Sequence, residues 1–343
     1  MSTMLNSRRM LFLLALLAAC GGDGRTVLTV YSPHGANMLG FFERAFEAEH
    51  PDVDVQSVDM GSQEVLDRLR AERANPQADV WFGAPAEIFD RGAGEGLLEA
   101  YTPTWREHVE EWHPEGYWYA MYLTPEVIAY NTEAVSRDEA PKDWDDVLDP
   151  RWSGRVLIRD PIPSGTMRAI FGGIIAREAQ RTGSFEAGYE WLRRLDANTK
   201  EYVLNPTLLY QKLARQEGLI TLWDMPDIAM LKGQRGMPID YVIPAGGTPV
   251  VVDAIGIVRG TGQPELAQRY YEFVTSPEML RVAADSFARI PARTDIPAES
   301  LPDWIREARE EIRPMPGDQA LIRERMDEWM RYWDANIRNR SRR

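Results

Sequence analysis

The chain has 343 residues, a formal net charge of −14 and a hydrophobic content of 44%. Its 11 Trp, 13 Tyr and 10 Phe supply a large buried core, which excludes an intrinsically disordered chain. The acidic balance argues against nucleic-acid binding, because a protein that neutralises phosphates needs a basic face. It does not exclude an anion site, since a few local cations suffice in one cleft.

The N-terminal segment predicts export. An arginine pair precedes the apolar run MLFLLALLAAC, which is too short to span a membrane and ends in small residues before Cys20. Two alanines directly before this cysteine resemble the bacterial lipobox, in which the cysteine is acylated and becomes the first residue. Ordinary signal cleavage is the alternative, but the chain has no second cysteine to pair with Cys20. We therefore predict a signal peptide over 1–19, a lipidated linker over 20–26, and a lipid-anchored protein on the periplasmic side of a membrane.

Three strand–turn–helix units are expected next. The runs 27–32, 52–60 and 78–84 are rich in apolar and β-branched residues, and each leads through small residues into a helical pattern. This alternation is typical of a parallel α/β sheet. In such sheets ligands bind at the carboxyl ends of the strands, beside helix N-termini.

The middle of the chain predicts a second sheet. The aromatic segment 116–131, interrupted by Pro125, is expected to pass as an extended strand from one domain to another. The next predicted elements are a strand at 155–160 that leads through Ser164-Gly165-Thr166 into a helix, a strand and helix at 218–231, two strands around a glycine turn at 238–260, and helices over 264–288.

The C-terminal region carries an apolar stripe at helical spacing. We expect this stripe to pack on the protein's own body, with 301–343 forming helices that cover the domains. Its members are Trp304, Ile322, Met326, Trp329, Met330, Trp333 and Ile337.

Several of these segments together resemble the extracellular solute-binding family of bacterial ABC importers, and above all its ferric-iron and phosphonate binders. They are the lipoprotein leader, VLTVYSPHG, LRAERANPQADVWFGAP, DPIPSGT, PAGGTP and AQRYYEFVTSPE, within about 27–293. The resemblance implies an α/β periplasmic-binding-protein clamshell, type II-like, of two open and mostly parallel sheets with flanking helices. Mapped onto this chain, domain I holds 27–121 with 252–300, and domain II holds 127–248.

The same resemblance implies a function without chemistry. The protein would be a monomer without a cofactor that captures a small solute and delivers it to an ABC permease and its ATPase. A ligand-binding subunit of a sensory system is a further alternative. An enzyme is not expected, because the chain has no G-x-S-x-G or H-E-x-x-H motif and its only possible facing acids are Asp160 and Asp224.

The candidate ligand residues lie at the predicted strand ends. Helix N-termini there offer unpaired N–H groups and a partial positive charge, which favour an anion, and Arg159 and Arg168 would add countercharge. Purely structural roles are the alternative for four of these residues. Ser62 and Ser164 would serve as helix N-caps, His34 would lie in a turn, and Trp223 would pack in the core. The candidates are Ser32, His34, Ser62 and Ala84 in domain I and Arg159, Ser164, Gly165, Thr166, Trp223 and Asp224 in domain II.

Iron is the alternative ligand. Ferric-binding relatives present adjacent tyrosines, but the adjacent pair here, Tyr270-Tyr271, lies within a helical pattern where the rings would point about 100° apart, so packing explains it better. The four histidines, His34, His50, His108 and His113, are scattered. We therefore predict no metal site and a small anionic solute, such as one bearing a phosphate or phosphonate.

Overall fold

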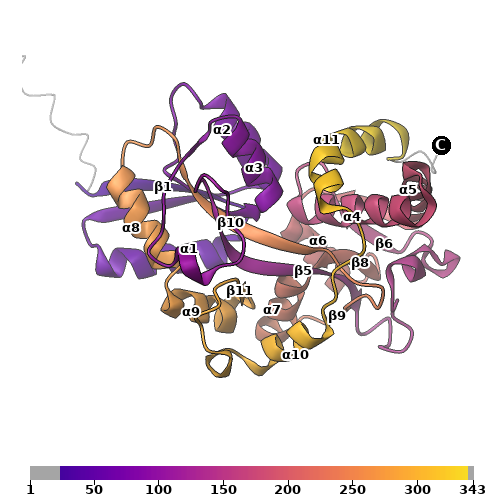
Figure 1. Cartoon of the computed structure of the whole chain (residues 1–343). Helices are drawn as coiled ribbons and strands as arrows, with labels where there is room; N and C mark the ends of the chain where they lie inside the picture. Colours follow the sequence, from indigo (N-terminus) through magenta and orange to yellow (C-terminus); the bar gives the residue numbers. More distant parts are fainter. Residues whose placement is uncertain (1–23, 339–343) are drawn as a thin grey trace, which may run out of the picture.

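The computed structural model describes residues 24–338. The predicted signal peptide and Cys20 lie outside the described residues. Eleven strands within 24–338 form a mixed sheet with the order β2-β1-β3-β10-β5-β8-β6-β7, and β4, β9 and β11 pair at its side. Helices cover the sheet in two lobes that are joined by the long strands β5 and β10 (Figure 1).

The first lobe confirms the three predicted strand–turn–helix units. Strand β1 pairs in parallel with both β2 and β3, as the alternation requires. The three strands therefore direct their carboxyl ends toward the same edge. The elements are β1 (Thr26–Ser32), α1 (Ala36–Glu49), β2 (Val53–Asp59), α2 (Ser62–Ala71), β3 (Val80–Pro85), α3 (Ala86–Gly94) and the short β4 (Leu98–Glu99).

The two lobes are joined by extended strands, as predicted for the segment around Pro125. The first part of β5 (Tyr119–Asn131) pairs antiparallel with β10 (Val250–Val258) up to Pro125. From Glu126 onward β5 pairs with strands of the second lobe. One continuous strand thus belongs to both halves of the sheet, which is the architecture of a two-domain clamshell.

The second lobe repeats the parallel arrangement around β6, which pairs with β7 and β8. The predicted strand–helix units at 155–181 and 218–231 are confirmed, whereas the sequence analysis assigned nothing to 183–217. The elements are β6 (Val156–Arg159), α4 (Gly165–Thr182), α5 (Phe185–Asn198), β7 (Thr199–Val203), α6 (Pro206–Ala214), β8 (Ile220–Asp224), α7 (Met225–Arg235) and β9 (Ile239–Val242).

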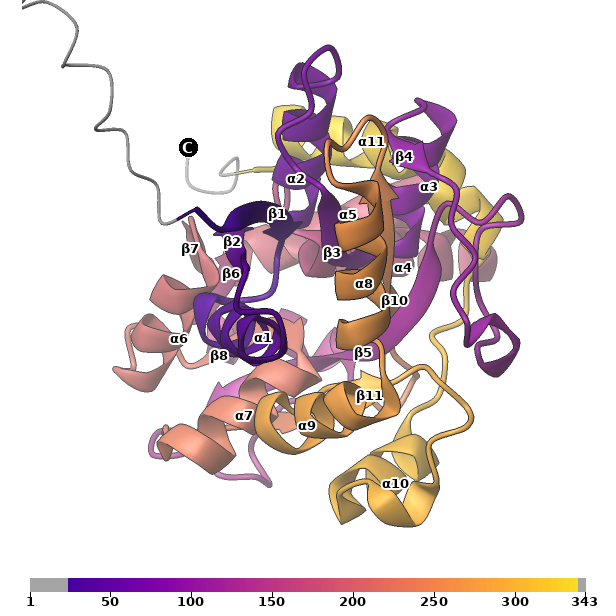
Figure 2. The same ribbon diagram turned by 90° about the vertical axis from the view of Figure 1, so that its left-hand side faces the viewer.

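The helices after β10 divide between the two lobes. The helices α8 (Pro264–Val274) and α9 (Pro277–Phe287) lie beside β10 and β11 (Ile290–Pro291) in the first lobe (Figure 2). Farther along, α10 (Asp303–Glu311) is followed by α11 (Gln319–Asn336), which lies on α4 and α5.

The predicted packing of the C-terminal stripe is confirmed. On α11, Trp329 and Trp333 are fully buried, and the Trp333 ring meets Phe171 of α4 edge-on at 5.5 Å. A Cβ at Gly172 would lie 2.4 Å from Met326 Cε, the end of a flexible side chain, so α11 approaches α4 closely at this glycine. Among residues 24–338 we find no helix whose length and hydropathy would allow it to cross a bilayer.

Candidate functional site

The carboxyl ends of β1 and β3 face those of β6 and β8 across the strands β5 and β10. We call this region the interdomain site. The N-termini of α2 and α4 also meet there, because the Gln63 backbone N–H donates to the Pro163 carbonyl at 3.3 Å. A Cβ built on Gly165 would lie 2.8 Å from both Ser62 Oγ and the Pro85 ring. The two lobes are therefore in contact, in a closed arrangement.

The end of β1 places a neutral histidine in this site. The backbone N–H of His34 donates to Ser32 Oγ at 3.1 Å, and its ring lies edge-on to Phe82 and Tyr122. Its Nε2 is buried and has no hydrogen-bond partner within residues 24–338. Burial, with the nearby Arg289 charge, holds the pKa of His34 well below its ordinary value. The Ser32 hydroxyl thus accepts the backbone N–H of this turn, whereas the imidazole Nε2 has no hydrogen-bond partner within residues 24–338.

The end of β3 has an unusual backbone. Gly83 and Ala84 both have positive φ, 84° and 150°. A Cβ on Gly83 would lie 2.3 Å from His34 Nε2, so only glycine lets the imidazole approach so closely. The Ala84 N–H donates to the buried carboxylate of Asp253. The backbone of Ala84 therefore holds a charged group at the site, and such unusual conformations are concentrated at functional positions.

The two serine candidates differ in their roles. The prediction that Ser62 caps α2 is wrong: the N-cap is Gly61, because the helix begins one residue earlier than predicted and the Glu64 carboxylate accepts the Gly61 N–H at 2.7 Å. Ser164 is the N-cap of α4, and its Oγ accepts the Met167 N–H at 3.3 Å. Gly165 and Thr166 follow in the first turn, and Thr166 is half-buried.

The two arginines predicted to supply countercharge also differ. Arg159, at the end of β6, is 4% exposed, and its nearest polar contacts are carbonyls, with Val203 at 3.4 Å. Within residues 24–338 no carboxylate lies at ion-pair distance from it, although Asp160 and Glu64 act on it electrostatically, and burial lowers its pKa. Arg168 instead leaves the site and bonds to Asp327 of α11. One unpaired cation therefore remains near the N-terminus of α4.

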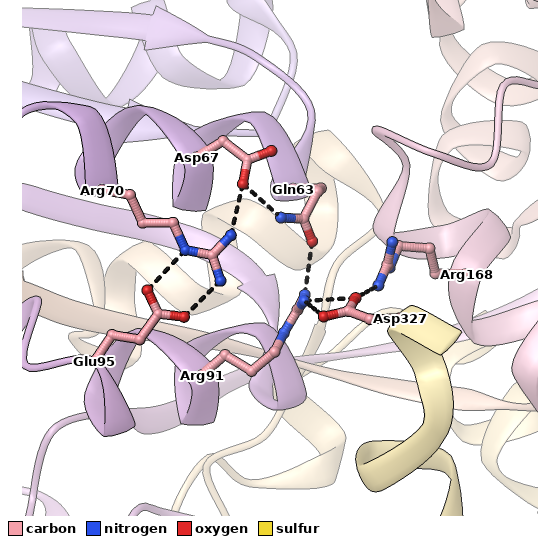
Figure 3. A network of polar contacts seen from close by, with 7 residues as sticks. All are labelled: Gln63, Asp67, Arg70, Arg91, Glu95, Arg168 and Asp327. Carbon is pink, nitrogen blue, oxygen red and sulfur yellow. Dashed lines mark hydrogen bonds and ion pairs between the residues drawn. The ribbon is translucent and has the colours of Figure 1, made fainter. Parts of the chain in front are cut away.

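A polar network ties the lobes together on the α11 side (Figure 3). Asp327 accepts hydrogen bonds from Arg91 of α3 at 2.7 and 2.8 Å and from Arg168 of α4. Arg91 also donates to Gln63 Oε1 at 2.7 Å. Because Arg91 and Gln63 belong to the first lobe and α4 and α11 to the second, this network spans the two lobes.

The end of β8 is less open than expected. The Trp223 indole N–H donates to Tyr210 Oη at 2.8 Å, and the ring is 4% exposed. Asp224 is the N-cap of α7 and accepts the Asp227 N–H at 2.8 Å. In the antiparallel pairing of β5 with β8, Asp224 stands directly opposite Glu126.

The crossing strands contribute residues that the sequence analysis missed. They are Tyr122, Thr124 and Glu126 on β5, Asp253 on β10, and Arg289 before β11. We treated the segment around Pro125 only as a connection between domains. The available signal was a single acidic residue within each of two apolar strands, since carboxylates are almost never fully buried without a reason.

Negative charge is concentrated at these positions. The Glu126 side chain is fully buried, and neither carboxylate oxygen has a hydrogen-bond partner within 24–338. Burial, reinforced by Asp224 and Asp253, raises the pKa of Glu126 well above its ordinary value. Burial likewise raises the pKa of Asp224 and of Asp253. Arg289 is close by, but its guanidinium contacts Asp227 at 2.9 Å.

The described residues form neither the predicted facing pair of Asp160 and Asp224 nor a clustered metal site. Asp160 bonds to Arg338 and accepts the Ile162 N–H at 3.0 Å, so it is not free to act with Asp224. Residues 24–338 contain no group of three or more His, Cys, Asp or Glu side chains suited to hold a metal.

The adjacent tyrosines are packing residues. Both Tyr270 and Tyr271 are buried in α8, and Tyr271 donates its hydroxyl to the Ile255 carbonyl at 3.2 Å. The packing interpretation is confirmed, because neither ring reaches the surface.

The fold is that of the periplasmic binding proteins. The structure of AfuA from Actinobacillus pleuropneumoniae, with exogenous fructose-6-phosphate bound, matches with a TM-score of 0.79 and 23% identity over 92% of this chain and 99% of that chain. A ferric binding protein from Campylobacter jejuni matches with a TM-score of 0.73 and 19% identity over 90% and 98%. The model for bacterial extracellular solute-binding proteins matches residues 75–309, and the chain belongs to this family.

Two curated relatives share most of their length with this chain. The first, y4fP of Sinorhizobium fredii, is named as an ABC transporter periplasmic-binding protein and is 27% identical over 91% of this chain and 86% of its own. The second is a periplasmic protein of Salmonella typhimurium named for 2-aminoethylphosphonate binding, 25% identical over 84% of this chain and 86% of its own.

Proposed function

We propose that this protein is the solute-binding lipoprotein of an ABC importer and that its interdomain site captures a small solute bearing a phosphate or phosphonate group. Family membership and the names of the relatives support the importer role. The anionic group is supported by one observation: the N-termini of α2 and α4 converge, and Arg159, at the end of the strand that leads into α4, has no close carboxylate partner within residues 24–338. On α2 the N–H groups of Gly61 and Gln63 already donate to Glu64 and to the Pro163 carbonyl. The oxyanion would therefore use the first-turn N–H groups of α4, the Gln63 N–H once it is released, and one cation, which together suit a tetrahedral anion.

Capture would proceed by closure of the lobes about β5 and β10. We infer that 27–121 with 252–300 move as one domain and 127–248 as the other, because the extended strands β5 and β10 run between them. The other contacts between the lobes lie at their facing surfaces: the α11 network, α2 with α4, and Arg289 with Asp227. The solute oxyanion would replace the direct contact of Gln63 with Pro163 by contacts to both helix termini. A closed, loaded monomer would then be the form that the permease and its ATPase receive.

Anion binding is tested by thermal unfolding and small-angle X-ray scattering with inorganic phosphate, fructose 6-phosphate and 2-aminoethylphosphonate. At least one phosphoryl compound should raise the unfolding temperature and reduce the radius of gyration. Acetate, added as the control anion in the same sulfate-free buffer, should do neither. Mass spectrometry of whatever copurifies would identify the physiological solute. The absence of stabilisation and of closure across the panel would refute the proposed ligand class.

A ferric solute is the second candidate, because ferric binding proteins share the fold. The buried carboxylates of Asp224 and Asp253 are the hard oxygen groups that the site would offer. A sensory role would use the same capture step. It would differ from import in the membrane protein that the closed form binds, a receptor instead of a permease.

The proposed anchor is tested separately at Cys20. Radiolabelled palmitate should be incorporated into the full chain and lost in Cys20→Ser, which should then appear in the soluble periplasmic fraction. A membrane-bound, unlabelled Cys20→Ser protein would refute lipidation at this residue.

A further inference from the structure

The inner wall of the interdomain site holds more negative charge than its neighbours balance. Glu126, Asp224, Asp227 and Asp253 act on one another electrostatically, and the one guanidinium among them is Arg289. Arg289 contacts Asp227 at 2.9 Å, and the Tyr210 hydroxyl donates to the other oxygen of Asp227. The single cation is therefore committed to one carboxylate.

The remaining carboxylates are only partly satisfied. Asp224 accepts the Asp227 N–H, and Asp253 accepts the Thr124 hydroxyl at 2.5 Å and the Ala84 N–H. The Glu126 carboxylate accepts no hydrogen bond from residues 24–338, although both its oxygens are buried. The strand register also places it directly opposite Asp224, where like charges destabilise an antiparallel pair.

The unsatisfied groups share one face of β5. Side chains alternate along a strand, so Tyr122, Thr124 and Glu126 point to the same side. On that side the Tyr122 hydroxyl, the His34 Nε2 and the Glu126 carboxylate are all buried without a hydrogen-bond partner within 24–338. Buried polar atoms are satisfied in nearly all folded proteins, so these atoms point to a polar group that the chain itself does not supply.

We propose that Glu126, with Asp224 and Asp253, binds an ammonium group, so that the solute is zwitterionic. This inference rests on the proposed function: the oxyanion would lie at the α2 and α4 termini, and the ammonium at Glu126. An ammonium group has three donors and a positive charge, and it forms charge-assisted bonds to carboxylates. A hydroxyl group would supply donors but would leave the charge of the wall unbalanced.

The same arrangement couples binding to protons. Burial raises the pKa of Glu126, Asp224 and Asp253. The other charged or titratable groups that face them are Asp227, Arg289, His34, Tyr122 and Tyr210. In the empty protein the raised pKa values favour protonated carboxyls, whereas an ammonium favours carboxylates. Binding of the ammonium should therefore release protons, and affinity should increase as the pH rises.

The experiment compares 2-aminoethylphosphonate with ethylphosphonate, which lacks only the amine, by titration calorimetry in buffers of different ionisation enthalpy. The wild-type protein should bind the amine at least tenfold more tightly and release protons only with it. Glu126→Gln should lose this tenfold preference and the proton release while keeping its affinity for ethylphosphonate. Glu133→Gln, an exposed glutamate just after β5, is the matched control and should behave as wild type.

A stability measurement verifies that the variant is folded. Because its pKa is raised in the folded state, Glu126 favours folding less as the pH rises above the ordinary glutamate range. Ligand-free Glu126→Gln should therefore unfold at a higher temperature than wild type at pH 8, with little difference at pH 4. Equal affinity for the two phosphonates would overturn the ammonium site and leave the proposed function standing. Failure of both phosphonates, phosphate and fructose 6-phosphate to bind would overturn both.

Discussion

Closure of the lobes can be blocked at one glycine. In Gly165→Ala the new Cβ would lie 2.8 Å from Ser62 Oγ and from the Pro85 ring, which belong to the opposite lobe. This separation is about 0.7 Å short of a comfortable carbon contact. Overpacking of this kind costs about 1–3 kcal/mol, and here the cost falls only on the closed form. Since 1.4 kcal/mol is tenfold, solute affinity should fall about 5- to 150-fold.

Folding itself should not suffer. Gly165 begins α4 and has no positive φ, and alanine is better suited to a helix by about 0.5–1 kcal/mol. The unfolding temperature of the ligand-free variant should therefore stay the same or rise. Gly233→Ala is the matched control, because Gly233 lies within α7 and a Cβ there would meet nothing within 4 Å. It should gain the same helix stability and keep full affinity.

The assay combines calorimetry with small-angle scattering, using the phosphoryl compound that binds the wild type most tightly. Gly61→Ala provides an independent test from the first lobe, since its Cβ would lie 2.6 Å from the Pro163 carbonyl oxygen. Both variants should bind weakly and retain a larger radius of gyration at saturation. Wild-type affinity and compaction in Gly165→Ala would show that the lobes do not meet as the structure has them.

Three further predictions concern the α11 side of the protein and the metal question. Arg91→Gln removes the arm of the Asp327 network that joins the lobes, and at saturating solute it should leave a larger radius of gyration than wild type has; an unchanged radius would contradict a joining role. Trp329→Ala empties a fully buried position and should lower the free energy of unfolding in urea by about 3–5 kcal/mol. Adding Fe(III) should give no phenolate-to-metal absorption in the visible, because Tyr270 and Tyr271 are core residues; a clear band would contradict this.

Controls for the α11 variants come from the same helix. Arg325→Gln breaks an exposed contact with Glu328 within α11, and it should measurably change neither the radius of gyration nor the free energy of unfolding. A loss of stability in Arg325→Gln as large as that of Trp329→Ala would mean that α11 is held by its surface charges rather than by its buried face.

Local sequence patterns were sufficient to predict most of the helices and strands and their order along the chain. Alternating strand and helix signals identified the units that begin at β1, β2, β3, β6 and β8, because hydrophobic period and turn residues act over a few positions. The stripe on α11 was found in the same way. The serine at the start of α4 was correctly assigned as a possible cap, whereas the start of α2 was misplaced by one residue, since helix boundaries depend on which side chain reaches the free N–H groups.

Local sequence patterns were enough to predict the family, the α/β clamshell and the strand ends where the site would lie. The chemistry of that site depends on contacts that form only in the folded chain. Glu126 and Asp253 lie more than a hundred residues apart, and the pairing of β5 with β8 and β10 brings them and Asp224 to one wall. The strength of a charge depends on its burial and its neighbours, which a linear pattern does not contain. The folded chain therefore brings together a group of buried carboxylates that the sequence did not predict.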